Sequence, residues 1–377
     1  DFLLAVNKPA EAQPWLEKAH QLQPEAVEPS LALTGLAMRN KDFKRAQAIA
    51  QEALAKKPDN PQLLDNLASV QLAAGEQNQA LVTLVKLVKA VPNSPLAYLK
   101  MANAQMLSGN KPGAIESLQK TITLAPNAVD AYVLLSRLYL QNKQPAEAMK
   151  TAQALQRLQP KAAAGYLLEG DVHMQAKAGA EAAAAYQRAN GIEPSSVGMI
   201  SRHRALVLDG KRSQADAEVD KWLGSNIQEI PARTYLAEQS LQNQQFARAA
   251  GYYEALAKLQ PNNPLLLNNL AYCYQQLKSP KARETAEAAL KLAPDNPAIM
   301  DTLGGVLLDD GFPQQGLKYL LRAAEMDKQN REIRLHLAQA YLKTGQTAKA
   351  KQELEKLAVY GDQSAVAATA RKLLSNL

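Results

Sequence analysis

The side chains best suited to chemistry in this chain are four histidines, one cysteine and a Glu–His pair with helical spacing. The histidines lie far apart in the sequence, at His20, His173, His203 and His336. Glu169 and His173 are one helical turn apart and could share a metal ion, but a zinc site needs a third and a fourth ligand. The sequence contains no phosphate-binding glycine loop, no HExxH and no GxSxG motif. We therefore predict no catalytic residue, no metal site and no cofactor, and interpret Glu169 and His173 as a helix-stabilising pair.

The composition argues against a nucleic-acid partner and against a membrane span. The chain of 377 residues carries 43 Lys and Arg and 36 Asp and Glu, a net charge of +7. The basic residues are spread along the sequence, whereas nucleic-acid-binding surfaces gather them on one face. No run of 18 or more apolar residues is present, so no membrane span is predicted. The single cysteine, Cys273, has no internal partner for a disulfide and is predicted to pack in the core.

Prolines at a fixed interval indicate which elements must position any site. Pro24, Pro58, Pro92, Pro126, Pro160 and Pro194 are each 34 residues apart, and Pro261 and Pro294 resume the series with a step of 33. In residues 95–128, apolar positions spaced by three and four predict two helices. Gly109 is expected to end the first helix and Pro112 to open the second. Such a hairpin cannot bury its apolar stripe alone, so it needs a similar hairpin on each side.

Other positions repeat together with the prolines. A small residue recurs in the second helix, where the two helices should cross closely: Ala46, Ala80, Ala114, Ala148, Ala182, Ala249, Ala282, Gly316 and Ala350. Four junctions between repeats place Asn60, Ser94, Asn263 and Asn296 directly before a proline. Each of these four residues is predicted to cap the following helix, because a side-chain oxygen there can accept from free backbone N–H groups.

The segment 197–230 departs from the pattern. In the register of its neighbours its two small positions hold Arg204 and Asp216, and one residue is missing before the next repeat. Two interpretations remain open. The segment is either a drifted repeat that its neighbours tolerate, or a bend or contact point in the array.

A period of 34 residues built from two helices is typical of tetratricopeptide repeats, and the chain resembles a tetratricopeptide-repeat (TPR) protein from end to end. The resemblance implies an all-α fold, a right-handed superhelix of about ten repeats with a C-terminal capping helix. We expect a partial repeat at 1–26, the array at 27–363 and the capping helix at 364–377. The repeats are expected to start near residues 27, 61, 95, 129, 163, 197, 231, 264, 297 and 331.

By analogy with this family, the first helices line a concave groove, and the residues five, six and nine positions into each repeat face it. We predict partner-binding residues at Asp65, Asn66, Ser69, Lys100, Asn103, Arg137, Asp171, Asn268 and Asn269. Asparagine can donate to and accept from an extended peptide backbone. Lys100, Asn103 and Arg137 would favour a carboxylate or an acidic segment. The alternative is a groove that is merely solvated.

The last hundred or so residues carry a more specific resemblance. The runs Asn268–Tyr272, Pro294–Ala298, Asp301–Gly304 and Glu332–Ala338 are similar, in order, to the C-terminal end of the TPR lipoproteins that accompany the PEP-CTERM/exosortase sorting system. Gly305 departs from that family, which tends to have a large aromatic residue there. The resemblance implies a scaffold for envelope export or exopolysaccharide assembly in a Gram-negative bacterium. It also implies a periplasmic or outer-membrane location, through a lipidated cysteine upstream of residue 1. The residues of the chain itself leave a cytoplasmic location open.

The sequence therefore predicts a non-enzymatic interaction scaffold that binds a protein or an extended peptide. Two alternatives belong to other classes. One is a targeting module of a larger enzyme, which the full-length sequence would reveal through a catalytic domain. The other is a direct polysaccharide-binding solenoid, which exposed aromatic platforms would favour; most tyrosines here occupy predicted packing positions.

Overall fold

The computed structural model describes residues 9–23, 25–359 and 361–377, and every regular element in these residues is an α-helix. The all-α repeat fold predicted from the sequence is confirmed. Residues 1–8, which belong to the predicted N-terminal partial repeat, lie outside the described residues. No helix in the described part of the chain is both long and apolar enough to cross a bilayer.

The chain divides into two compact units, Asp1–Ala215 and Asp216–Leu377. The first unit contains α2 (Pro9–Leu22), α3 (Val27–Arg39), α4 (Phe43–Lys56), α5 (Pro61–Ala73), α6 (Gln77–Ala90), α7 (Pro95–Leu107), α8 (Lys111–Leu124), α9 (Val129–Gln141), α10 (Pro145–Leu158), α11 (Ala164–Gln175), α12 (Gly179–Ile192) and α13 (Ser196–Leu208). Helix α14 (Arg212–Ser225) begins in the first unit and continues into the second. The second unit contains α15 (Pro231–Gln242), α16 (Phe246–Leu259), α17 (Pro264–Gln276), α18 (Lys281–Leu292), α19 (Pro297–Asp309), α20 (Pro313–Met326), α21 (Arg331–Lys343), α22 (Thr347–Leu357) and α23 (Ala365–Leu374).

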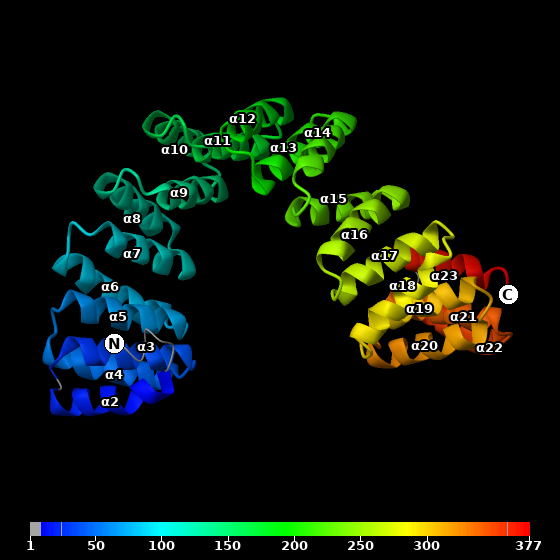
Figure 1. Cartoon of the computed structure of the whole chain (residues 1–377), viewed down its shortest axis with the longest axis horizontal. Helices are drawn as coiled ribbons and strands as arrows, with labels where there is room; N and C mark the ends of the chain where they lie inside the picture. Colours follow the sequence, from blue (N-terminus) through cyan, green and yellow to red (C-terminus); the bar gives the residue numbers. More distant parts are fainter. Residues whose placement is uncertain (1–8, 24, 360) are drawn as a thin grey trace. The chain divides into compact units, whose positions relative to one another are not determined.

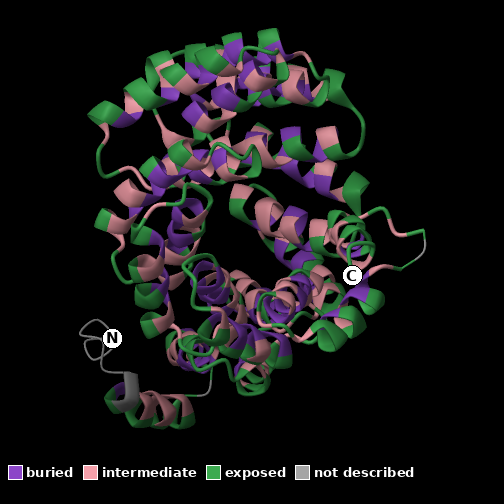
Figure 2. Ribbon diagram, turned by 90° about the vertical axis from the view of Figure 1, so that its right-hand side faces the viewer, coloured by how far each residue is buried: buried purple, intermediate pink, exposed green. Residues whose placement is uncertain are grey.

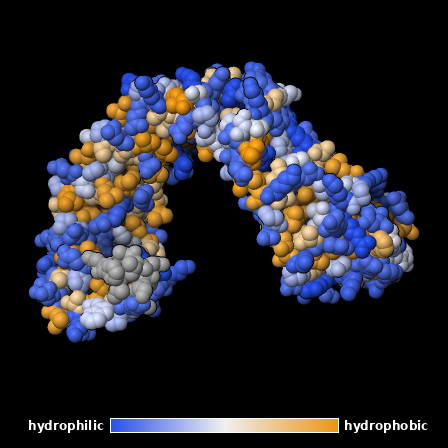
Figure 3. Space-filling model, in the orientation of Figure 1, coloured by the Kyte–Doolittle hydropathy of each residue, from blue (hydrophilic) through white to orange (hydrophobic). Residues whose placement is uncertain are grey.

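Within each unit, consecutive helices pair as hairpins, and successive hairpins stack side by side (Figure 1). The odd-numbered helices from α3 to α21 are the first helices of the repeats, and the even-numbered ones are the second helices. First helices of neighbouring repeats also contact each other. For example, α17 contacts α19, and α19 contacts α21. Figure 2 shows buried positions alternating with exposed ones along each helix, as expected for thin interfaces between helix pairs rather than one large core. The visible face in Figure 3 is mainly hydrophilic, with scattered apolar residues.

Small side chains hold the two helices of each hairpin close together. The small residue predicted in the second helix is buried at every expected position: Ala46, Ala80, Ala114, Ala148, Ala182, Ala249, Ala282, Gly316 and Ala350. At one crossing the contact is so close that glycine is required on both helices. A Cβ atom on Gly304 would lie 2.6 Å from Cγ of Leu320, and one on Gly316 would lie 2.7 Å from the carbonyl oxygen of Gly304. Larger residues would overpack these contacts.

The four predicted helix caps are confirmed. The side chain of Asn60 accepts from the backbone N–H groups of residues 62 and 63, and that of Asn296 from those of residues 298 and 299. Ser94 and Asn263 each accept one backbone N–H bond. A cap of this kind stabilises a helix by about 1 kcal/mol. Each of these caps fixes where its first helix begins, and therefore which residues of that helix face a groove.

Each hairpin turns through one residue in the left-handed backbone conformation. These residues are Lys41, Gly75, Gly109, Lys143, Lys177, Gly210, Gln244, Lys278, Gly311 and Gly345. In the turn at Gly75, its N–H donates to the carbonyl of Leu72, and the N–H of Glu76 donates to that of Gln71. Two crossed bonds of this kind end a helix in a Schellman motif. The left-handed residue therefore marks the register of each repeat independently of the prolines.

This register corrects the interpretation of residues 197–230. The turns are 34 residues apart except for two intervals of 33, Lys177 to Gly210 and Lys278 to Gly311. The missing residue therefore lies before helix α13, where the junction with α12 has three residues, and not before the following repeat. The two small positions are taken by His203 and Ala215, which are both buried, rather than by Arg204 and Asp216. The prediction was wrong by one residue because the prolines mark only the ends of the second helices.

Replacing a non-glycine turn residue by glycine should stabilise the chain. Lys143 has a φ of 56°, a region in which a Cβ atom is strained. We expect Lys143→Gly to raise the free energy of unfolding by about 0.5 kcal/mol, the relief of strain less the entropy that glycine adds to the unfolded chain. Urea unfolding measures it, with Gly109→Lys as the matched variant, which should lower stability. A loss of stability in Lys143→Gly would contradict the role given to this turn.

Candidate functional site

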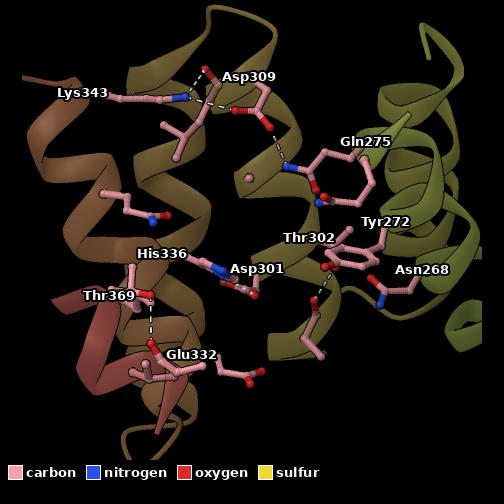
Figure 4. Close-up of a pocket in the computed structure, with 18 of the residues that line it drawn as sticks. Asn268, Tyr272, Gln275, Asp301, Thr302, Asp309, Glu332, His336, Lys343 and Thr369 are labelled. Carbon is pink, nitrogen blue, oxygen red and sulfur yellow. Dashed lines mark hydrogen bonds and ion pairs between the residues drawn. The ribbon is translucent and has the colours of Figure 1, made fainter. Parts of the chain in front are cut away.

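A cavity of about 870 Å³ lies in the second unit, along α17, α19, α21 and α23 (Figure 4). The three first helices run side by side, so equivalent positions of successive repeats lie next to each other across the cavity. Position five of these repeats gives Asn268, Asp301 and Leu335, position six gives Asn269, Thr302 and His336, and position nine gives Tyr272, Gly305 and Gln339; all nine line the cavity.

Helix α23 closes one side of the cavity. It packs on α21 and α22, with Val366 and Leu373 facing the cavity as apolar side chains. The turn before α23 is fixed by Asp362, whose carboxylate accepts from the backbone N–H of Ser364 at 2.8 Å and pairs with Arg331 at 2.6 Å. These two partners lower the pKa of Asp362 to about 2. The ion pair between Arg331 and Asp362 therefore holds α23 against α21.

At the far end of the cavity, hydrogen bonds connect polar side chains of three repeats. Asp309 accepts from Nε2 of Gln275 at 2.8 Å and from Nζ of Lys343 at 3.1 Å, and Lys343 also donates to the carbonyl of Leu308 (Figure 4). These bonds connect the C-terminal ends of α17, α19 and α21. The single charge of Lys343 is already engaged by Asp309.

A His–carboxylate pair occupies the middle of the cavity. The ring nitrogen Nδ1 of His336 lies 2.9 Å from both carboxylate oxygens of Asp301, which is on the adjacent repeat. The side chain of His336 is 41% exposed and that of Asp301 is 15% exposed. Burial disfavours the imidazolium, but the hydrogen bond from the ring to Asp301 and the charges of Asp301 and Glu332 together raise the pKa of His336 above its usual value.

Sequence profiles identify the fold family. A profile described as tetratricopeptide repeat matches residues 3–70 and 307–374, and a second profile with the same description matches residues 133–196 and 236–297. Together these segments span more than half of the chain. The chain is a tetratricopeptide-repeat protein. A further profile, described as the second ARM domain of tetratricopeptide repeat protein 21, matches residues 68–143.

Solved structures similar to this TPR protein are distant in sequence. MamA from Desulfovibrio magneticus RS-1 is 22% identical with a TM-score of 0.37, over 43% of this chain and 92% of that chain. YrrB, described as a TPR protein with an unusual peptide-binding site, is 16% identical with a TM-score of 0.40, over 50% and 97%. A TPR protein from Parabacteroides merdae is 13% identical with a TM-score of 0.44, over 83% and 98%. The comparison with curated proteins gave no match.

Three predicted groove residues of the first unit of the TPR protein are paired with each other. Nζ of Lys100 on α7 lies 2.5 Å from a carboxylate oxygen of Asp65 on α5, and it also donates to Oγ of Ser69 at 3.1 Å. A carboxylate ligand of Lys100 would have to compete with Asp65. Asn103 is half-buried on α7. Whether these residues bind an acidic partner stays a prediction.

The remaining predicted residues fall into two groups. On α11, the carboxylate of Asp171 accepts from the hydroxyl of Tyr186 at 2.7 Å, and the charge of Arg137 on α9 opposes the rise in its pKa that desolvation causes. Amide atoms form the second group. Within the described residues, Nδ2 of Asn66 and Oδ1 of Asn268 are buried without a hydrogen-bond partner, whereas Asn269 donates to the hydroxyl of Tyr253 at 3.2 Å. A buried amide atom without a partner is costly, but neither of these two atoms has surface that a ligand could contact.

The residues that could do chemistry outside the groove have structural partners. Glu169 lies 3.9 Å from His173, and it also accepts from Arg188 at 2.8 Å and from Gln156 at 2.6 Å. Cys273 is fully buried, as predicted, and burial raises the pKa of its thiol to about 11. Among the described residues, no three His, Cys, Asp or Glu side chains are placed to hold a metal ion.

Several cavity residues were absent from our predicted set. Asp301, Thr302, Gly305, His336 and Gln339 occupy the same positions five, six and nine that were considered in earlier repeats, so the same pattern could have found them. Helix α23 carries no such signal, because it lies outside the repeat period.

Proposed function

We propose that this TPR protein is a non-catalytic scaffold that holds a partner protein, through an extended peptide segment, along its first helices. The observation that carries this proposal is the cavity of about 870 Å³ in the second unit, where polar side chains of three consecutive repeats converge. Ligand sites of this size are usually concave and contain a few polar groups that fix orientation. The exposed carboxylate of Glu332 is such a group.

We also propose that the scaffold works in the cell envelope, in PEP-CTERM protein export or exopolysaccharide assembly. The support is the resemblance of the C-terminal residues to TPR lipoproteins of that system. A full-length protein labelled with a radioactive fatty acid, followed by membrane fractionation, tests the anchor. Unlabelled protein in the cytosolic fraction would contradict the location and leave the scaffold proposal standing.

Site-directed photocrosslinking in cells tests the scaffold proposal. A photoreactive phenylalanine analogue at Gln339 lines the cavity, whereas the same analogue at Glu325, an exposed residue of α20, lies outside it. We expect a discrete crosslinked protein with the first variant and none with the second. Equal crosslinking at both positions, or none at Gln339, would contradict a partner held in the cavity.

A direct polysaccharide-binding role has one observation in its favour. Tyr272 is 38% exposed and is the aromatic residue among the cavity-lining side chains. Crosslinking to Gln339 that persists after protease treatment but disappears after glycosidase treatment would favour the glycan alternative over a protein partner.

A further inference from the structure

The cavity of the second unit has more negative than positive charge available to a ligand. Its lining contains three carboxylates, Asp301, Asp309 and Glu332, against Lys343 and His336. Lys343 is engaged by Asp309, and Asp301 faces His336. The exposed carboxylate of Glu332 has no ion-pair partner in the part of the chain that the structure describes. A ligand that brings one positive charge would therefore meet an uncompensated carboxylate.

Tyr272 and Glu332 face the same space from opposite helices. Tyr272 is on α17 and Glu332 on α21, and both line the cavity (Figure 4). Burial is the main cause that raises the pKa of Tyr272, and the charge of Glu332 adds to it across the cavity. An exposed phenol ring opposite a carboxylate suits a cation, which the ring face attracts through its quadrupole.

Gly305 leaves space in the floor between these side chains. Unlike Gly304, whose Cβ atom would clash with Leu320, a Cβ atom on Gly305 would meet only the far end of Gln275, at 3.1 Å. Gly305 also has no positive φ that would require glycine. In a helix interior glycine costs about 1 kcal/mol relative to alanine, and packing gives no reason for it here. Its effect is to keep the cavity open between Tyr272 and Gln339.

We propose that this cavity receives a lysine or arginine side chain from an extended segment of the partner, an inference that rests on the proposed scaffold function. The cationic head is placed between Tyr272 and the carboxylate of Glu332, which both line the cavity. The aliphatic stem packs along Leu335, Val366 and Leu373, as long basic side chains commonly do on apolar walls. Carboxylates in the cavity repel phosphate, which disfavours nucleic acid and anionic lipid as ligands.

His336 makes this binding sensitive to pH. The charged groups facing it are Asp301 on α19 and Glu332 on its own helix, with Tyr272 on α17; α23 contributes no titratable residue to the lining. When His336 is protonated, its positive charge offsets the negative charge of Asp301. The cavity then attracts a basic ligand less strongly. Because Asp301 and Glu332 raise the pKa of His336, binding should weaken as the pH falls through that raised pKa.

Fluorescence anisotropy with a matched pair of peptides tests the proposal on the whole chain. The probe is a labelled heptapeptide of glycine, serine and alanine with one central arginine, and its control carries citrulline, the uncharged isostere, at that position. We expect the arginine peptide to bind about tenfold more tightly, the size of one charge-assisted contact. Glu332→Gln should remove this preference, and His336→Gln should remove its dependence on pH. Glu325→Gln makes the same change at an exposed position of α20 outside the cavity. It should alter neither the preference for arginine nor the dependence of that preference on pH.

Gly305→Phe provides a second measurement. It should abolish binding of the arginine peptide while the circular dichroism and melting temperature stay close to those of the parent, because its side chain enters the cavity and not the helix crossing. Equal binding of the arginine and citrulline peptides, or a preference that survives both Glu332→Gln and Gly305→Phe, would overturn the proposal. Photocrosslinking at Gln339 would still decide the scaffold function separately.

Discussion

Gly170→Ala is expected to destabilise the first unit by about 2 kcal/mol, although it adds a single methyl group and improves helix propensity. Gly170 on α11 faces the ring of Tyr186 on α12, one of the largest fully buried side chains. A Cβ atom on Gly170 would lie 2.6 Å from Cδ1 and Cζ of that ring and closer still to Cε1. Overpacking of this severity costs about 3 kcal/mol, and the gain in propensity returns about 1 kcal/mol.

A second substitution should rescue this variant. In other repeats of the chain the equivalent contact joins an alanine to a leucine, as in Ala102 with Leu118, and both are fully buried. Tyr186→Leu alone should also destabilise, because it loses the ring volume and the hydrogen bond to Asp171. The double variant Gly170→Ala with Tyr186→Leu should lose about 1–2 kcal/mol less than the sum of the two single losses. Urea unfolding of the four proteins measures this coupling, and additive losses would show that the pair does not set the crossing of α11 and α12.

Ala114→Trp is expected to cost about 3 kcal/mol or more and to disorder the repeat locally. Ala114 on α8 is fully buried against Ala102, Leu118 and Leu135, so an indole has no space. Because each repeat contacts only its neighbours, the damage should stay near α7, α8 and α9. Hydrogen exchange measured by mass spectrometry should show faster exchange in these helices and little change near the chain's C-terminal repeats.

Glu116→Trp is the matched control for that variant. It introduces the same side chain two residues away, at an exposed position of α8, where a substitution usually changes stability by less than about 0.5 kcal/mol. If Ala114→Trp melted like Glu116→Trp, the packing register described for this hairpin would be incorrect.

The repeat fold could be predicted because local chemistry and periodicity indicate the same elements. Pro61 and Pro297 start helices, and Asn60 and Asn296 cap them in the structure as the sequence predicted. The register of α13 was missed because the prediction followed the prolines, which mark the ends of the second helices. The turn after α13 contains Gly210, and this glycine places the missing residue before that turn. The preceding turn has Lys177 in the left-handed position, and a lysine gives no such marker in the sequence.

The site was predictable only in part. Asn268 and Asn269 were predicted and both line the cavity, because positions within a repeat follow from the period. The pairing of Lys100 with Asp65 was not predictable, since it depends on how two long side chains meet across neighbouring helices. The contribution of α23 depends on Arg331 and Asp362, which hold a helix that is not a repeat. Partner binding by any of these residues stays a prediction.

The shared geometry of the hairpin turns has a consequence for how such a chain changes over time. Between two consecutive left-handed turn residues lies a segment that begins and ends with the same backbone conformation and carries one second helix and the next first helix. Recombination between two such points would add or delete a whole segment and leave the apolar faces in phase. The protein could thereby gain or lose a binding position, such as the one proposed at Gly305, without redesigning the flanking helices.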